Sequence, residues 1–296
     1  MRIRLPAALA ILLLSLLSSC AGDTAAAGKV SGNLTVTGSS TVAPLIAEIA
    51  LRFEAQHPGA RIDVQAGGSS RGLHDVQAGL ADVGMMSREL KDSETGEVQA
   101  HTIARDGVAL ILHASNPVSA LDADQVRAIY RGEVTDWSEL GGAAGEITVI
   151  NKASGRATLE VFLDHYGLSE GEIKADLIIG DNQQGLKAVA GSPLAIGYVS
   201  IGAAEYEIEA GAALQLLPSD GIAASVASVA TGRFPISRPL NLITVGEPEG
   251  LARAFIDFCR STAVHDLVAD LRFSPAQSMA GSASQAVVDS SNAGTR

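Results

Sequence analysis

The sequence predicts an α/β fold, and three observations support this prediction. Short apolar segments of strand length alternate along the chain with longer segments whose apolar residues recur at helical spacing. The chain has 296 residues, of which 47% are hydrophobic, so it is long enough for one or two domains with a substantial core. No repeat of solenoid length interrupts the alternation, which excludes a repeat architecture.

The expected strands are marked by alternating apolar residues or by short continuous apolar runs. Leu34 and Val36 alternate with polar residues, and Ile62 and Val64 do the same in the next strand. Residues 107–113 form an almost continuous apolar run, which is typical of a strand buried on both faces. In chain order the expected strands are residues 33–37, 60–66, 82–86, 107–113, 147–150, 176–180, 195–200 and 240–245.

The expected helices lie between these strands and each has one apolar face. Asp122 or Asp124 is expected to cap the third of them, because a carboxylate there can accept from free backbone N–H groups. Tyr130 and Trp137 are expected to pack in a core rather than stack on a ligand. The apolar faces are formed by Val42, Leu45, Ile46, Ile49 and Phe53; by Leu73, Val76 and Leu80; by Val126, Ile129 and Tyr130; by Leu159, Phe162, Leu163 and Tyr166; and by Leu251, Phe255 and Phe258.

The first residues have the pattern of an export signal. Arg2 and Arg4 precede an apolar stretch at 5–17, which is too short to span a bilayer as a stable helix. Small residues and then Cys20 follow, which resembles a bacterial lipobox with Cys20 as the lipidated first residue. An ordinary signal peptide with an incidental cysteine is the alternative. We expect a signal peptide at 1–19, a tether at 20–31 and a flexible tail at 277–296.

Composition and cysteine content exclude several classes of function. The chain has 21 Lys and Arg against 33 Asp and Glu, for a net charge of −12, and removal of residues 1–19 makes it −14. Such an acidic chain is not expected to bind nucleic acid. No CxxC, HExxH, Walker A or GxGxxG motif occurs, so neither a metal nor a nucleotide cofactor is expected. Cys259, next to Phe258, is expected to be a buried apolar residue rather than a nucleophile.

Four segments at the ends of expected strands contain Gly, Ser, Thr or basic residues: 38–41, 67–72, 84–88 and 151–158. A helix N-terminus offers unpaired N–H groups, hydroxyls add donors, and Gly lets a backbone approach closely. Ligands of open α/β sheets gather at the carboxyl ends of strands. Each segment alone is compatible with ordinary helix capping, but four of the same character favour a site for a tetrahedral anion.

These segments resemble a known family. The motifs TGSSTVAP (37–44), GGSSRG (67–72), DVGMMSR (82–88), IARDGVA (103–109), IYRGEVTDW (129–137), AIGYVS (195–200) and FPISRPL (234–240) occur in the order found in the phosphate-binding lipoproteins of ABC-type phosphate importers. The resemblance covers about residues 32–275. It implies a two-lobed type II periplasmic-binding-protein fold with a ligand cleft between the lobes, formed by residues 32–114 plus 236–276 and by residues 115–235.

The resemblance also implies a function and its partners. The chain is expected to be a binding protein and not an enzyme, without a cofactor, and to be a monomer. It is expected to bind inorganic phosphate in the periplasm or at the cell exterior and to deliver it to the permease subunits of an ABC transporter. Its membrane attachment would be the lipid on Cys20.

Site residues follow from the matching motifs. Ser87 occupies a position where many phosphate-specific members have an Asp, and the usual R-x-x-G-S-G-T loop reads KASGRAT at 152–158. Because Lys is a point charge and Arg a bidentate fork, we hypothesise that Arg156 makes the main ionic contact and that Lys152 supports it or points away. The residues expected to bind phosphate are Ser40, Thr41, Val42 through its N–H, Ser69, Ser87, Lys152, Arg156, Ala157 and Thr158.

Three alternatives remain open from the sequence. Residues 68–72 match the G-x-S-x-G elbow of serine hydrolases, with Ser70 as nucleophile, His265 as base and Asp176 or Asp257 as its partner. The protein could instead bind phosphate as a sensor or adhesin. A third alternative is another tetrahedral oxyanion, such as sulfate, molybdate or an organophosphate.

Overall fold

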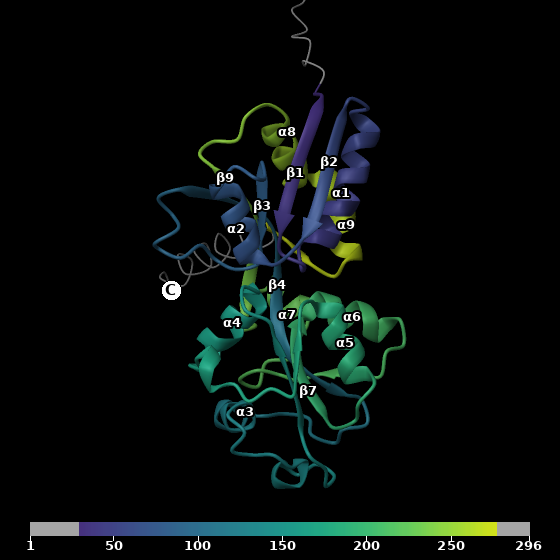
Figure 1. The fold of residues 1–296 in the computed structure, drawn as a ribbon. Coiled ribbons are helices and arrows are strands. Elements are labelled where there is room, and N and C mark those ends of the chain that lie inside the picture. The colour runs from purple at the N-terminus through teal and green to yellow at the C-terminus, as the bar shows by residue number, and fades with distance from the viewer. Residues whose placement is uncertain (1–29, 277–296) are drawn as a thin grey trace, which may run out of the picture.

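A computed structural model describes residues 30–276. Figure 1 shows two lobes, with strand β4 running from one into the other. The expected signal peptide, Cys20, most of the tether and the tail at 277–296 lie outside the described residues. Within the described part of the chain, no helix is long and apolar enough to cross a membrane.

One mixed sheet extends through both lobes, in the order β2-β1-β3-β9-β4-β7-β5-β6. In the first lobe β1, β2 and β3 are parallel, and β9 is antiparallel to both β3 and β4. The first-lobe strands are β1 (Gly32–Gly38), β2 (Ala60–Ala66), β3 (Val83–Met86), β4 (Val98–His113), β9 (Ser237–Val245) and β10 (Ser274–Pro275). Its helices are α1 (Ala43–Gln56), α2 (Ser69–Gln77), α8 (Gly250–Cys259) and α9 (His265–Asp270), with the 3-10 turn η3 (Thr262–Val264).

The second lobe continues the sheet from the far half of β4. Its strands are β5 (Thr148–Lys152), β6 (Leu177–Ile179), β7 (Ala195–Ser200) and β8 (Leu214–Leu216). Its helices are α3 (Ala123–Tyr130), α4 (Ala157–Tyr166), α5 (Asn182–Ala190), α6 (Ile201–Glu209) and α7 (Val226–Ala230), with η1 (Trp137–Leu140) and η2 (Glu170–Glu172). The α/β fold class predicted from the sequence is confirmed.

Strand β4 is much longer than the apolar run at 107–113 predicts. Its first part, from Val98 to Gly107, pairs with β9 in the first lobe, and its second part, from Val108 to Leu112, pairs with β7 in the second lobe. The first part has polar residues in its sequence, so its pairing with β9 and β10, rather than an apolar pattern, reveals it as a strand. Because β4 pairs with strands of both lobes, it connects them. The lobe boundaries given above stay predictions.

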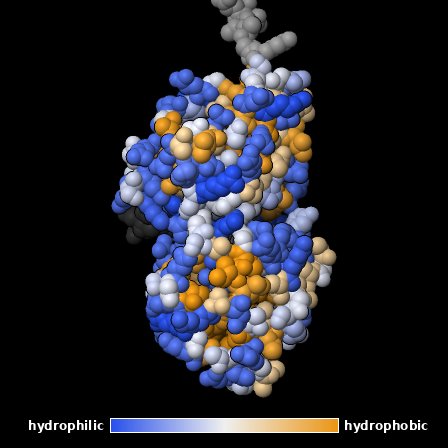
Figure 2. Space-filling model, in the orientation of Figure 1, coloured by the Kyte–Doolittle hydropathy of each residue, from blue (hydrophilic) through white to orange (hydrophobic). Residues whose placement is uncertain are grey.

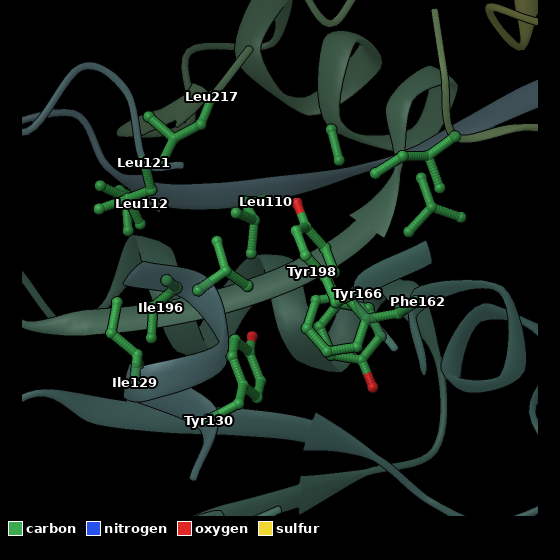
Figure 3. Close-up of a cluster of buried hydrophobic side chains, with 14 of the residues drawn as sticks. Leu110, Leu112, Leu121, Ile129, Tyr130, Phe162, Tyr166, Ile196, Tyr198 and Leu217 are labelled. Carbon is green, nitrogen blue, oxygen red and sulfur yellow. The ribbon is translucent and has the colours of Figure 1, made fainter. Parts of the chain in front are cut away.

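Each lobe has its own hydrophobic core. Figure 3 shows part of the second core, where Phe162 stacks on Tyr198 with ring centroids 3.9 Å apart and planes 3° from parallel. Tyr130 and Trp137 are fully buried there, which confirms their predicted packing role. In the first core Cys259 is buried as predicted, and burial raises the pKa of its thiol well above the usual range. Because Tyr130 and Trp137 are buried in the second core, neither ring is available to a ligand between the lobes.

Candidate functional site

The segments that follow β1, β2 and β3 meet in the first lobe, next to the second lobe. The hydroxyl of Ser39 donates to the hydroxyl of Ser87 at 2.9 Å, and the N–H of Ser87 donates to Ser69 Oγ at 3.2 Å. All three side chains are buried. Three of the four predicted segments therefore form one cluster of hydroxyls and backbone N–H groups.

Glycines allow this close meeting. Gly38 has φ +133°, and a Cβ at this position would lie 2.3 Å from the carbonyl oxygen of Met85. A Cβ on Gly72 would come within 2.8 Å of both Gly38 Cα and Thr37 O. Since no side chain fits at either position, Gly is required where β1, α2 and β3 converge.

Three helices that follow the predicted segments have no side-chain N-cap. No side chain accepts from the first N–H groups of α1, α2 or α4, and the same is true of α8 and α9, which contribute nothing to the cluster. Side chains of Asp122, Asp181, Ser200 and Ser225 cap α3, α5, α6 and α7, respectively. Asp122, rather than Asp124, is thus the predicted cap of α3. At α1 the N–H groups of Thr41 and Val42 lie 3.2 and 3.4 Å from Ser39 Oγ, and at α2 the N–H of Ser70 donates to Gly155 O. Within residues 30–276, the start of α4 is therefore the helix end here whose N–H groups an anion can accept from.

Arg238, at the beginning of β9, lies at the centre of the site. Its guanidinium is 1% exposed and donates to Asp106 Oδ2 from Nε at 3.2 Å and from Nη2 at 2.9 Å. Nη1 donates to Thr158 Oγ1 at 2.8 Å and lies 3.4 Å from Ser87 Oγ, while Nη2 lies 3.4 Å from Thr41 Oγ1. One side chain thus donates to hydroxyl groups of both lobes, and Asp106 holds it in place.

Lys152, at the end of β5, is the second buried cation. Its ammonium donates to the carbonyl oxygen of Asp181 at 2.7 Å and to Asn182 Oδ1 at 3.2 Å, and the residue is 3% exposed. Burial, followed by repulsion from the charges of Arg238 and Arg156, lowers the pKa of Lys152 to about 7. Lys152 is thus linked to the first-lobe cluster through Asn182, which donates to Thr41 Oγ1, and its part in binding stays a prediction.

Arg156, for which the sequence suggested the main ionic contact, lies at the boundary between the lobes. Its Cδ would be 3.1 Å from a Cβ placed on Gly68 of the first lobe, and its Nη2 would be 3.5 Å from a Cβ on Gly180. The side chain is only partly buried, and within residues 30–276 its guanidinium has no hydrogen bond or ion pair. The geometry favours Arg238 for the central contact, and an ionic role for Arg156 stays a prediction.

The other predicted residues are distributed around this centre. Thr41, Ala157 and Thr158 are buried, whereas Ser40 is partly exposed and its neighbour Ser39 occupies the buried position. The N–H of Val42 lies 3.4 Å from Ser39 Oγ. Sequence reasoning missed Ser39 and Arg238. Both lie in motifs that carried the family resemblance, and an Arg beside an apolar strand was the one available signal for Arg238.

The lobes contact each other beside the site. Ser70 N donates to Gly155 O at 3.2 Å across the boundary. Glu160, on α4, lies 3.1 Å from Arg88 Nε and 2.6 Å from Lys91 Nζ of the first lobe. Arg88 is itself held by two hydrogen bonds to Glu94, at 2.8 and 2.9 Å. Buried Arg88 therefore borders the boundary between the lobes, whereas Arg71 is exposed and pairs with Asp75.

Neither a hydrolase triad nor a metal cluster occurs in the described part of the chain. The hydroxyl of Ser70 lies 3.5 Å from Glu160 Oε1, and no histidine among residues 30–276 hydrogen-bonds to it. His265 instead lines a separate cavity with Thr102 and Cys259. Ser70 and His265 therefore do not make, in the described part of the chain, the contact that a nucleophile and its base require. Residues 30–276 also contain no group of three or more His, Cys, Asp or Glu that could hold a metal.

Comparison with known proteins gives consistent matches over most of the chain. A family model described as a PBP superfamily domain matches residues 23–262. The phosphate-binding protein PstS of Bacillus subtilis is 31% identical over 255 residues, which cover 85% of this chain and 83% of the relative. PstS of Borreliella burgdorferi is 24% identical over 252 residues, covering 81% of this chain and 88% of the relative.

Solved structures give the same result. A protein from Clostridium perfringens, described as a phosphate ABC transporter substrate-binding protein with bound phosphate, is 30% identical with a TM-score of 0.76. The match covers 82% of this chain and 99% of the other. An ABC-type phosphate transport receptor from Vibrio cholerae is 25% identical with a TM-score of 0.65, over 82% of this chain and 99% of the other.

Proposed function

The chain belongs to the PBP superfamily and, within it, to the family of the phosphate-binding protein PstS, and from this membership we propose that it binds inorganic phosphate outside the cytoplasm and delivers it to an ABC-type importer. The observation that carries the proposal is the position of Arg238. It lies fully buried between the lobes among hydroxyls of both, and the hydroxyls and N–H groups there suit a tetrahedral oxyanion.

Each part of the site has a task in this binding. Arg238 supplies charge-assisted hydrogen bonds, and Asp106 orients it, since both of its hydrogen bonds to Asp106 involve Oδ2. Thr41, Ser69 and Ser87 donate from the first lobe, and Thr158 and the start of α4 donate from the second. Lys152 adds a positive charge when it is protonated. An anion that accepts from both lobes at once holds them together.

Closure of the lobes couples binding to delivery. A ligand bound by both lobes favours the closed arrangement, with β4 serving as the connection. The closed pair of lobes is the form that the permease of an ABC transporter would recognise. The protein acts as a monomeric binding protein in this proposal, and it releases its ligand without changing it chemically.

Specificity between oxyanions depends on the protonation state of the ligand. Hydrogen phosphate, unlike sulfate, carries a hydroxyl group. That hydroxyl can donate a hydrogen bond to a carboxylate of the site. Here Ser87 stands at the position where many family members have an Asp, and the buried Asp106 is occupied by Arg238. Another tetrahedral oxyanion is therefore the second candidate ligand.

Titration calorimetry with phosphate and with sulfate, at two pH values, tests the proposal. We expect phosphate to bind tightly and sulfate weakly. Arg238→Gln is expected to abolish phosphate binding, whereas the matched control Arg233→Gln, at an exposed arginine of the same segment, leaves it unchanged. Equal binding of both anions would refute phosphate specificity, and no binding of either would refute the function.

We also propose that a lipid on Cys20 anchors the protein to a membrane, with the protein on the outer side of that membrane. The support is the order of basic residues, apolar stretch, small residues and cysteine at the start of the chain. Growth with an alkyne-tagged fatty acid should label the wild-type protein and not Cys20→Ser. Equal labelling of both would contradict the anchor.

A further inference from the structure

A cavity of about 560 Å³ lies between the lobes, next to the anion site. The first lobe lines it with the start of α1 and the end of β2, and the second lobe with the starts of α5 and α6. Figure 2 shows the narrow waist between the lobes. The volume falls within the range of small-molecule sites, and binding of inorganic phosphate makes no use of it.

The lining is mostly apolar. Each wall contributes an apolar side chain: Ala47 comes from α1, Val64 from β2, Ala203 from α6 and Phe273 from the segment before β10. Tyr206 adds a ring that is 51% exposed. An apolar group bound in the cavity would displace water from these apolar surfaces. The cavity therefore suits a hydrocarbon or aryl group rather than a second anion.

The polar end of the cavity is formed by two residues of the anion site. Asn182 Nδ2 donates to Thr41 Oγ1 at 3.2 Å, which joins the two lobes at this point. On its other side, Thr41 Oγ1 lies 3.4 Å from Nη2 of Arg238. A single pair of side chains therefore separates the cavity from the central cation.

We propose that this cavity is a subsite for the apolar substituent of an organic phosphonate or phosphate monoester whose oxyanion lies against Arg238. The proposal rests on the anion site of the proposed function and extends its ligand class. Continuity with that site favours an organic oxyanion over a free apolar molecule, because the cavity's polar end leads to Thr41 and Arg238. For such a ligand the Thr41–Asn182 hydrogen bond opens and the substituent passes between the two side chains.

The carboxylate at the edge of the cavity restricts the substituent. Asp181 lines the cavity and uses one side-chain oxygen to cap α5 through the N–H of Gln184. A negatively charged substituent would be repelled there. The expected ligand class is therefore an oxyanion with one neutral apolar group, for which phenylphosphonate is a suitable probe.

Two exposed alanines of α1 provide a matched pair of variants. Ala47 lines the cavity, and Ala55 lies in the same helix outside it. Ala47→Phe fills the space that the substituent needs, whereas Ala55→Phe adds the same side chain elsewhere. Because neither alanine is buried, both variants are expected to fold.

Titration calorimetry of the three proteins with phenylphosphonate, methylphosphonate and inorganic phosphate tests the proposal. Phenylphosphonate should bind the wild type at least about tenfold more tightly than methylphosphonate does. Ala47→Phe should remove that advantage and keep the affinity for inorganic phosphate within about twofold, and Ala55→Phe should change neither.

Two results would overturn the subsite while leaving phosphate binding intact. They are an absence of phenylphosphonate binding to a protein that binds inorganic phosphate, and phenylphosphonate binding that Ala47→Phe leaves unchanged. Failure of inorganic phosphate to bind would instead refute the proposed function, and the subsite with it.

Discussion

Phosphate binding is expected to take up a proton at Lys152. The ammonium is buried, and its pKa is lowered to about 7 by burial first and then by the charge of Arg238. Its two acceptors, Asp181 O and Asn182 Oδ1, are neutral groups. An anion arriving beside Lys152 favours the charged form, so its pKa rises on binding.

The lowered pKa fixes the size of the effect. With a pKa of about 7 before binding and a fully protonated ammonium afterwards, binding takes up about 0.5 proton at pH 7 and about 0.9 at pH 8. Between pH 7 and pH 9 the protonated fraction falls about 50-fold, which corresponds to about 2.3 kcal/mol of binding free energy.

Calorimetry in buffers of different ionisation enthalpy measures the proton uptake directly. Sulfate serves as the second ligand, because it has no ionisation near neutral pH and leaves Lys152 as the titrating group. Lys152→Arg is the matched control, since an arginine stays protonated and should bind without proton uptake. Zero uptake by the wild type at pH 8, or equal uptake by Lys152→Arg, would refute the reasoning.

The same pKa predicts a trend in stability. In the unfolded chain Lys152 has its ordinary pKa of 10.5, so as the pH falls from about 10.5 to about 7 the unfolded chain binds a proton that the folded protein does not. The stability contribution present above pH 10.5 is thus lost across this window. Chemical denaturation should show Lys152→Met gaining stability relative to the wild type as the pH falls.

Three further predictions concern Arg238, Glu160 and Phe162. Arg238→Gln leaves Asp106 buried without its cation, so urea denaturation should show a loss of about 3–5 kcal/mol; an unchanged midpoint would contradict the pairing. Glu160→Gln removes the ion pairs between the lobes, so stopped-flow measurement should show faster phosphate release and a smaller salt effect on it than in the wild type. Phe162→Ala removes a ring stacked in the second core and should cost about 3–5 kcal/mol of stability with phosphate affinity kept, whereas lost affinity would place the ring in the site.

Strand periodicity predicted much of the fold, and it failed where a strand is polar. The ranges 60–66 and 195–200 coincide with β2 and β7. The first half of β4 was missed because it contains His101, Arg105 and Asp106, whose side chains do not form an apolar pattern. Long-range pairing, mainly with β9 and also with β10, makes this segment a strand, and long-range pairing leaves no local signal.

The same limit explains the central residue of the site. Arg238 directly precedes Pro239, a pattern that reads as a turn before the expected strand at 240–245. Its partner Asp106 is 132 positions earlier and reaches it only through the β4–β9 pairing. The burial of Ser39 rather than Ser40 was equally hidden, because two adjacent residues of the same type carry no sequence signal for which of them turns inward.

The acidic composition of the chain and the binding of an anion are compatible because they act over different distances. Surface carboxylates separated from the site by more than about 8 Å are largely screened at physiological salt. Arg238 and Lys152 are buried, where their hydrogen bonds are weakly screened, and the nearby Asp106 is neutralised by Arg238. A nucleic acid would have to meet the acidic surface along its length, whereas one small oxyanion meets only the buried donors. A net charge of −12 therefore disfavours an extended polyanion without preventing one small oxyanion from binding at the buried donors.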